Sequence, residues 1–538
     1  MKKILTIIIG FFATVTVAGL AQAGPGSVEV QTLGDITIRM GAQVRLVPTQ
    51  EVSRDFGVSS TLSSSEEATA AAAMRSLGGG GGNSTKTHLN EAGGAVKDGY
   101  IRGENRLFFN FAHDQDWDVY FALESDTTLD RSSADRTDFA IGKQSQQFGI
   151  ERLEATFNLP WINSRLEGGW DVRGADVKFG GLVYGDDDPH IGIAGCAQGF
   201  DWAVRYTKKD ESEAGYYLDN GTNAIGAADQ KTNVDRTFYW GTLGYNFKDL
   251  GTYVQGFYFY DDNMMTPTGD YPNSESHRNF IGINYKGQYG IFKPLAEFVY
   301  NTGKYVTADD NRDYNIDAYA MFADLAVDLK QYVPAQQFEV HVGGYYVSGD
   351  HDTSDHRLTG FAPAVGISRF SPRFGSEQSI SFDGNPVLGQ ILYSMLPAYY
   401  GTVRGGGING GAALDNPGFE MIGGGLKTKA YGVTYITHAM AMWFNDSTGV
   451  EAYYMNQGLA GVDGQIDDFM GVEWNNEVRY NIYKNVTLKG GAAFFFPGSG
   501  AKDITKALNA IGRGVTYDQG KKSDDVSMRF AAELLWFF

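Results

Sequence analysis

Cysteine is almost missing from this chain of 538 residues, and the single Cys196 excludes an internal disulfide framework. Long hydrophobic runs are also scarce. After the first two dozen residues, no apolar stretch approaches the roughly 20 residues that a membrane-spanning helix needs. Basic residues are outnumbered, with 44 Lys and Arg against 64 Asp and Glu and a net charge of -20. This balance argues against a nucleic-acid partner, because phosphate binding depends on clustered Lys and Arg.

Motifs for catalysis and for metal binding are missing too. The eight His residues are scattered, and we find no nucleophile–base pair of the kind that a hydrolase needs. We therefore expect no enzymatic activity, no cofactor and no metal site. Asp350, Asp352 and Asp355 offer clustered oxygens of the kind that calcium prefers. The 12-residue loop pattern with its central Gly and final Glu is absent, so solvated loop acids are the preferred interpretation.

The N-terminal segment has the composition of an export signal. Lys2 and Lys3 are followed by an apolar run over 4–20 and then by Ala21-Gln22-Ala23, a small-residue cleavage site. We predict a signal peptide over residues 1–23 that is cleaved after Ala23. Residues 24–538 would then form the mature, exported chain.

What the sequence has in abundance is glycine, with 70 residues, and aromatic residues, at 14% of the chain, although the mean hydropathy is -0.28. The last segment explains this combination. Apolar residues occupy every second position: Val526, Met528, Phe530, Ala532, Leu534, Trp536 and Phe538. Polar residues such as Arg529 and Glu533 lie between them. This period of two predicts a strand with one face toward lipid and one toward water.

Segments with the same alternation recur along the chain, and they predict the fold. They cover 35–47, 99–112, 117–126, 150–159, 164–173, 190–196, 200–208, 237–247, 252–261, 278–286, 291–301, 315–329, 336–348, 419–429, 431–444, 468–482, 486–496 and 526–538. Short turns alternate with long polar connections, as in outer-membrane barrels. We predict an all-β fold: one transmembrane antiparallel β-barrel of about 18 strands. Sixteen remains an alternative, because no clear turn divides 419–444.

Charged residues on the polar faces of these strands are candidates for lining a pore. The candidates are Arg102, Glu104, Arg106, Arg152, Glu154, Arg165, Glu167, Arg205, Glu477 and Arg479. In a wide, water-filled barrel they would set up an electric field across the lumen. Alternatively, they form cross-strand pairs that stiffen the wall. The two interpretations do not exclude each other.

Two of the long connections differ in composition. Segment 49–98 has runs of Ala, Gly and Ser and predicts a mobile outer loop. Segment 349–418 contains many aromatic and aliphatic residues that a solvated loop does not need. We hypothesise that it folds into the barrel and narrows it, with Arg369, Arg373 and Arg404 facing carboxylates of the wall. The alternatives are an external cap or a contact between protomers.

The penultimate hairpin has a familiar sequence. Residues 472–474 (VEW), 478–488 (VRYNIYKNVTL) and 494–498 (FFFPG) resemble outer-membrane channels of the alginate-export type. With the final strand, the resemblance covers about the last seventy residues. It implies an 18-stranded barrel that the barrel-assembly machinery inserts through the strand ending at Phe538.

These features together predict a porin of the bacterial outer membrane, in contact with lipid and lipopolysaccharide. Small hydrophilic solutes or ions would diffuse passively through its water-filled lumen. One alternative is a barrel that serves as a scaffold and sheathes a partner protein, such as a redox protein. Another is a polysaccharide-export channel. A homotrimer and a monomer both remain open.

Overall fold

The alternating segments pair side by side into one sheet that closes on itself. A computed structural model describes residues 28–53, 58, 61–63, 65–66, 69, 97–128, 149–210, 235–264, 275–306, 313–352, 354–365, 372–374 and 416–538. The strands are β1 (Val28–Leu33), β2 (Ile36–Val52), β3 (Lys97–His113), β4 (Trp117–Thr128), β5 (Gly149–Leu159), β6 (Ser164–Gly174), β7 (Gly185–Ala197), β8 (Phe200–Asp210), β9 (Arg236–Phe247), β10 (Thr252–Asn263), β11 (Glu275–Gly287), β12 (Phe292–Val306), β13 (Asp313–Asp328), β14 (Gln337–Val347), β15 (Arg357–Leu358), β16 (Phe419–Ala430), β17 (Val433–Trp443), β18 (Phe469–Tyr483), β19 (Val486–Pro497) and β20 (Ser527–Phe537).

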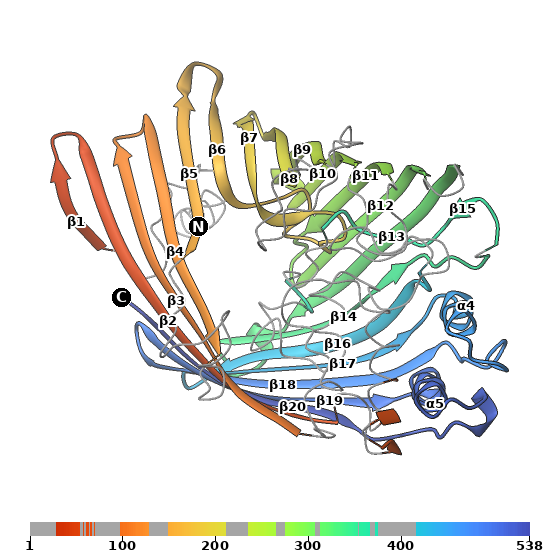
Figure 1. Cartoon of the computed structure of the whole chain (residues 1–538). Coiled ribbons are helices and arrows are strands. Elements are labelled where there is room, and N and C mark those ends of the chain that lie inside the picture. Colours follow the sequence, from red (N-terminus) through yellow and green to blue (C-terminus); the bar gives the residue numbers. More distant parts are fainter. Residues whose placement is uncertain are drawn as a thin grey trace, which may run out of the picture.

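Eighteen of the described strands, β2–β14 and β16–β20, form a closed antiparallel barrel (Figure 1). The last strand closes it, because β20 pairs with β2 from Gln43↔Phe537 to Val52↔Met528. This confirms the predicted 18 strands. Tyr431 and Gly432 divide 419–444 with positive φ angles of 51° and 80°, which suit a tight hairpin turn. The short β1, which the sequence analysis did not predict, pairs with β2 beyond the end of β20.

The connections differ in length between the two rims. Two-residue turns such as 198–199 and 484–485, and single 3-10 turns such as Pro160–Ile162, join the strands at one rim. The longer connections lie at the other rim. Two of these, treated above as polar links, contain helices: α4 (Thr448–Asn456) and α5 (Ser499–Arg513). Within the described residues, no helix is long and apolar enough to cross a membrane.

The two helices form a small core of their own beside the barrel, at the rim of the long connections (Figure 1). Tyr453 and Tyr454 of α4 are buried in one cluster with Leu508 of α5. Val58, from the segment predicted to be a mobile outer loop, is 1% exposed in the same cluster. Asn509 Nδ2 donates to Thr61 Oγ1 over 2.8 Å. Part of that segment is therefore anchored to the helices, and most of the rest lies outside the described residues.

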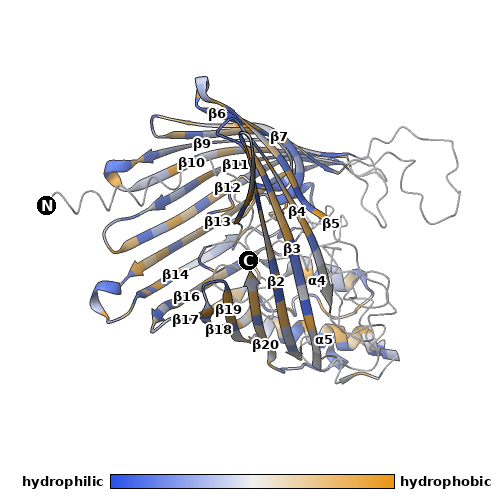
Figure 2. Cartoon of the chain, turned by 90° about the vertical axis from the view of Figure 1, so that its left-hand side faces the viewer, coloured by the Kyte–Doolittle hydropathy of each residue, from blue (hydrophilic) through white to orange (hydrophobic). Residues whose placement is uncertain are grey.

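The outer wall of the barrel is apolar because side chains alternate between its two faces (Figure 2). In β13, for example, Met321 and Leu325 are exposed, whereas Ala320 and Phe322 on either side of Met321 are buried. Exposed apolar residues on other strands include Leu107, Phe157, Leu166, Ile191, Val204, Leu243, Ile281, Phe298, Val342, Ile422, Val472, Leu488 and Phe530. Hydrocarbon can cover such a surface, and a closed barrel leaves no strand edge unpaired in lipid.

A charged residue in the middle of this outer wall should destabilise the folded barrel. Ile281 lies near the centre of β11 and is 53% exposed. We expect Ile281→Arg to lower the free energy of unfolding in lipid vesicles by about 2–4 kcal/mol, because the guanidinium would enter hydrocarbon. Urea titration checks this. Tyr431→Arg is the matched control, since Tyr431 is 98% exposed in a turn at the rim and its replacement should cost under about 1 kcal/mol. Equal effects of the two variants would contradict a lipid-facing wall.

Candidate functional site

A belt of ion pairs follows the inner face of the barrel across β19, β20 and β2–β5. Lys489 Nζ lies 2.5 Å from Glu533 Oε1, and Arg45 Nε lies 2.8 Å from Glu533 Oε2. Arg45 Nη1 also pairs with Glu104 Oε2 at 2.9 Å. Glu104 Oε1 in turn lies 3.4 Å from Arg106 Nε. The charges therefore alternate in sign from strand to strand, across the closure of the barrel.

The belt continues over β4–β8 with further ion pairs. Arg106 contacts Glu124 and, at 3.4 Å, Glu151. Further round, the pairs are Arg173 with Glu154, Glu167 and Asp171, Arg152 with Asp171, and Arg165 and Arg205 with Glu167. His190 Nε2 lies 3.1 Å from Glu154 Oε1. Glu154, Glu167 and Asp171 thus each pair with two or more basic residues.

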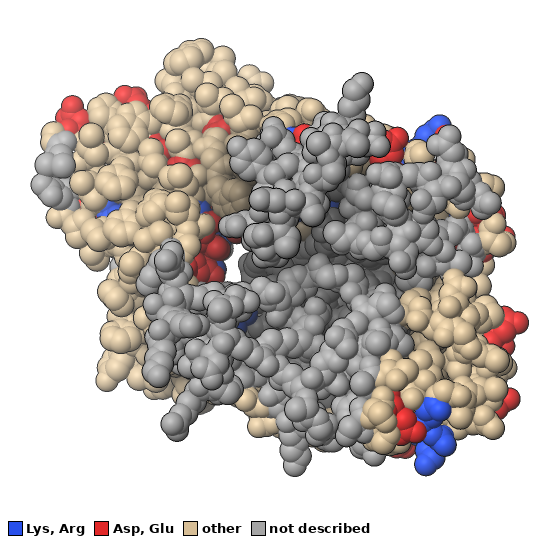
Figure 3. Space-filling model, in the orientation of Figure 1, with Lys and Arg blue, Asp and Glu red and all other residues tan. Residues whose placement is uncertain are grey.

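The ten candidates from the sequence all lie on the inner face. On β3, Arg102, Glu104 and Arg106 alternate with the exposed apolar residues, and the candidates on β5, β6, β8 and β18 do the same. Glu477 pairs with Arg479 on its own strand. Figure 3 shows acidic and basic side chains beside a gap near the left-hand wall. In the same orientation, Figure 1 places β2–β5 at this wall.

Cations and anions of the belt differ in their exposure. The side chains of Glu104, Glu154 and Glu167 are at most 6% exposed. Those of Arg106, Arg152 and Arg165 are 24%, 28% and 26% exposed. These three carboxylates therefore lie beneath the guanidinium groups, whereas the Glu151 side chain, at 23%, is about as exposed as those of the three arginines.

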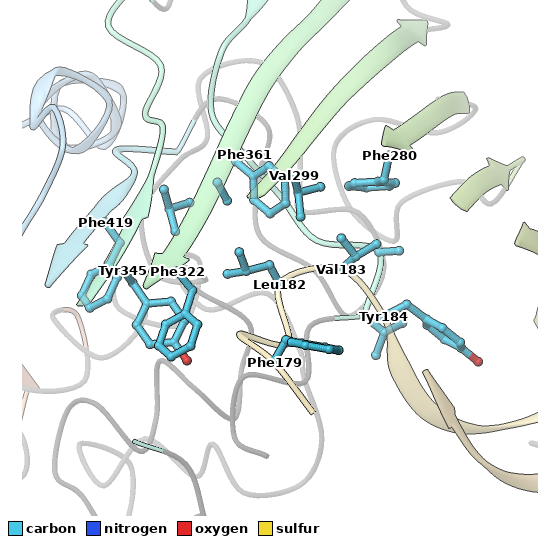
Figure 4. Packing of buried hydrophobic residues seen from close by; sticks show 14 of the residues in the cluster. Phe179, Leu182, Val183, Tyr184, Phe280, Val299, Phe322, Tyr345, Phe361 and Phe419 are labelled. Atoms are coloured by element: carbon cyan, nitrogen blue, oxygen red, sulfur yellow. The ribbon is translucent and has the colours of Figure 1, made fainter. Parts of the chain in front are cut away.

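The opposite stretch of the inner face, on β9–β14, carries a large apolar cluster that is covered by an inward loop, residues 175–184, between β6 and β7 (Figures 1 and 4). Tyr184 packs on Phe238, Trp240 and Phe259, with ring centroids 5.0–5.7 Å apart. Burial raises the pKa of Tyr184 well above its ordinary value, and its hydroxyl donates to Asp188 Oδ2 over 3.1 Å. The loop thus crosses the interior and packs against the far wall.

The tip of the inward loop reaches β12–β14. Tyr345 of β14 donates its hydroxyl to Gly180 O over 3.2 Å. A Cβ added to Gly180 would lie 2.7 Å from the side chain of Phe322, so only glycine allows the backbone to come this close. In Figure 4, Leu182 and Phe179 lie between Phe322 of the wall and Tyr184 at the end of the loop.

A second segment, the strap (residues 359–365), lies against the inward loop. Val365 N donates to Val183 O over 3.0 Å, and Gly185 N donates to Val365 O over 3.0 Å. Phe361 packs edge-on against Phe280, with ring centroids 6.0 Å apart. The strap belongs to the 349–418 connection, for which we hypothesised from the sequence a place inside the barrel, with an external cap or a contact between protomers as alternatives.

Two buried arginines hold the strap to the wall. Arg236 and Arg278 both pair with Asp261, at 2.9 and 2.5 Å, and none of the three side chains is exposed. Arg236 also donates to Ala364 O over 2.8 Å, and Arg278 donates to Ala362 O over 2.7 Å. The three side chains, which we call the arginine clamp, connect three neighbouring strands to the backbone of the strap.

Of the three arginines predicted for the 349–418 connection, Arg373 lies within the described residues and Arg369 and Arg404 lie outside them. Arg373 Nε lies 2.9 Å from Asp324 Oδ1, and its Nη1 lies 2.6 Å from Glu339 Oε1. Its neighbour Phe374 is 2% exposed and packs on His341 of the inner wall, with ring centroids 5.0 Å apart.

The three aspartates considered as calcium ligands each accept a hydrogen bond from a different residue. Asp350 accepts from the hydroxyl of Thr359, Asp352 accepts from Ser354, and Asp355 accepts from the backbone N–H of Arg357. In the part of the chain that the structure describes, no group of three potential ligands is placed to hold a metal ion.

The inward loop and several belt residues were missed by the sequence analysis. The loop carries Phe179, Leu182, Val183 and Tyr184 between two polar strands, the same apolar signal that drew attention to 349–418. Arg45, Arg173, Lys489 and Glu533 belong to the belt although they were not among the candidates. The sequence could have placed these four residues on the inner face, because each alternates with apolar residues that point outward.

The chain matches no protein-family model and has no significant sequence match among curated proteins. Several solved structures have a similar fold. Pseudomonas aeruginosa OccK11 (OpdR) is 10% identical, with 95% of this chain and 99% of that chain covered and a TM-score of 0.44. P. aeruginosa OccK5 (OpdH) is 10% identical over 93% and 98%, with a TM-score of 0.45. A BenF-like porin from Pseudomonas fluorescens Pf-5 has the same values. At this level of similarity, we base the function on the barrel's own residues.

Proposed function

We propose that this chain is an outer-membrane porin through which small hydrophilic solutes or ions diffuse passively. The observation that carries the proposal is the contrast between the two faces of one closed barrel. The outer face is apolar and exposed, whereas the inner face carries the belt of ion pairs from β18 to β8. Because so many charged side chains would be costly to remove from water, we infer that the bore they line is filled with water.

The ten candidate residues and the rest of the belt then line the pore, and the inward loop and the strap narrow it. Both segments cover the apolar cluster on β9–β14 and leave the belt to face the solute. A solute would therefore pass between an apolar surface and exposed guanidinium groups. The residues beyond the strap in the 349–418 connection, including Arg369 and Arg404, are proposed to add to this constriction.

Flux of solutes into lipid vesicles tests the proposal directly. Proteoliposomes placed in isotonic solutions of small sugars, amino acids and carboxylates should swell, and the rate should fall as the solute grows. Vesicles holding heat-denatured protein provide the control. If folded protein gives no faster swelling than empty vesicles for any solute, the porin function is wrong.

The exposed guanidinium groups should influence which ions pass. Arg106 pairs with Glu104, Glu124 and Glu151, and its side chain is 24% exposed. We expect Arg106→Gln to shift the cation-to-anion permeability ratio toward cations by about twofold, because the carboxylates lose their counter-charge. Reversal potentials in a salt gradient measure the ratio. Lys304→Gln, at a 60% exposed residue that pairs with Asp313 on the outer face, should leave it unchanged. A shift as large in the Lys304 variant would contradict a role for the belt.

The resemblance of the last hairpins to alginate-export channels keeps a polysaccharide-export channel as a second candidate function. An export channel would pass long anionic polymers, whereas a porin would pass only small solutes. Block of ion current by alginate fragments of increasing length would distinguish them. Current that returns once a long fragment has passed through favours export. Lasting exclusion of such fragments favours the porin.

The remaining proposals concern partners. The strand that ends at Phe538 closes the barrel: Phe538 N donates to Ala42 O over 3.0 Å, and Ala42 N donates to Phe538 O over 2.7 Å. We propose that the barrel-assembly machinery recognises this strand and that lipopolysaccharide surrounds the rim of long connections. A homotrimer is one alternative to a monomer, and mass measurement in detergent decides between them.

A further inference from the structure

Two carboxyl groups meet where the inward loop touches the wall. Asp176 belongs to the loop and Glu297 to the inner face of β12, and the two carboxyl groups act on each other's titration. Asp176 is 0% exposed and Glu297 2% exposed. Two carboxylates can share a hydrogen bond only if one of them carries a proton, since an ionised carboxylate has no donor.

The other hydrogen bonds of this pair all come from the backbone of the inward loop. Glu297 Oε2 accepts the N–H groups of Gly180 and Gly181, at 2.6 and 3.1 Å. Asp176 accepts those of Val183 and Tyr184, at 2.6 and 3.2 Å. Glu297 therefore binds the loop to the wall, in addition to Tyr345, and Asp176 holds the loop in the shape that presents its amides.

The charged groups on the neighbouring elements have partners elsewhere. On β13, Asp324 pairs with Arg373 and His341, and on β12, Lys293 pairs with Asp328 and Glu339. The arginines of β9 and β11, Arg236 and Arg278, pair with Asp261 of β10. Tyr253 of β10 donates to Asp201, and Tyr345 of β14 donates to Gly180 O. Lys178 of the loop itself is exposed.

No described cation is thus paired with either carboxyl of this pair. Burial raises the pKa of Asp176 above its ordinary value, although hydrogen bonds from the Glu297 carboxyl and from loop amides oppose the shift. A group whose pKa is raised in the folded state binds its proton more tightly there. The contact it supports is therefore complete in acid and is lost as the pH rises through the raised pKa.

We propose that Asp176 and Glu297 form a proton-dependent latch on the inward loop. With one proton shared between them, the loop stays packed against β12 and the bore stays narrow. Loss of that proton in alkaline solution leaves two anions in contact in a dry site, where their repulsion is strong. The loop then leaves the wall and the bore widens. The latch rests on the proposed channel function, because the width of the bore matters only if solutes pass through it.

Glu297→Gln separates the latch from simple packing. The amide has the same shape and can donate to Asp176, but it does not titrate. For wild-type protein, we expect single-channel conductance to rise by roughly twofold between pH 5 and pH 9, as the bore widens. For Glu297→Gln and for Asp176→Asn, conductance should stay at the acid value over the same range. Lys178→Gln, on the same loop, should behave like the wild type.

Hydrogen exchange of the loop amides gives a second readout that does not require a conducting pore. Exchange of Gly180, Gly181, Val183 and Tyr184 amides, corrected for its intrinsic pH dependence, should accelerate at pH 9 in the wild type and not in Glu297→Gln. If the wild type does not conduct at any pH but shows this exchange pattern, the channel function fails and the latch stands. Equal pH profiles of exchange in the wild type and both carboxyl variants would overturn the latch.

Discussion

Replacing Asp261 by Ala should cost the barrel about 3–5 kcal/mol of unfolding free energy, the expected penalty for leaving a buried charge without its partner. Asp261 pairs with both buried guanidinium groups of the arginine clamp. Without it, Arg236 and Arg278 would repel each other in a site from which water is excluded. They could relieve this only by moving apart, which would also displace the carbonyls of the strap that they hold.

Urea unfolding in lipid vesicles measures the loss. Asp262→Ala is a matched control, because Asp262 is the next residue on β10 but is 35% exposed and pairs with His277 at the surface. Its replacement should change the unfolding free energy by less than about 1 kcal/mol. Asp261→Asn, which keeps the shape and loses the charge, should fall between the two. If Asp261→Ala proved no more costly than Asp262→Ala, the arginine clamp would not be a buried, dry site.

The second large effect concerns the pore itself. Replacing residues 177–182 by a short Gly-Ser link should raise single-channel conductance by roughly twofold or more, because the inward loop occupies the cross-section between its wall and the belt. The apolar side chains of its tip, Phe179 and Leu182, are buried against β9–β14 and are at most 6% exposed. Their removal leaves an apolar wall in contact with water, so some loss of stability should accompany the gain in conductance.

The control for this variant is a shortened connection at the outer rim. Residues 459–464 follow α4 and belong to the helical cluster outside the bore, so their replacement by the same link should leave conductance unchanged. A loop variant with wild-type conductance would show that the inward loop does not limit flow. A gain in both variants would instead indicate that the barrel is loosened in general.

How far the sequence determines this structure depends on the range of the interactions. Alternation along a strand is local, so all eighteen barrel strands were predictable, and with them the face on which Glu104 or Arg205 lies. The turn at Tyr431 and Gly432, which divides residues 419–444 into two strands, also follows a local rule, because glycine suits a tight turn.

Contacts between distant segments carry no such local signal. Arg45 and Glu533 are 488 residues apart and meet only because β20 closes the barrel against β2. The helix α5 was missed because its polar residues outweighed its apolar stripe, which is buried only when Val58 and α4 supply a partner. The inward loop was missed because its apolar residues occupy a short connection, where they find burial against strands β9–β14 far along the chain.

The central claim is that an apolar outer wall faces lipid while a charged inner wall encloses water. Single-channel recording in planar bilayers tests it most directly, with purified, folded protein and simple salt on both sides. We predict discrete, uniform conductance steps that scale with the conductivity of the salt solution and shrink when small polyethylene glycols enter the bore. Folded protein that inserts into the bilayer and carries no current would contradict this structure of the pore.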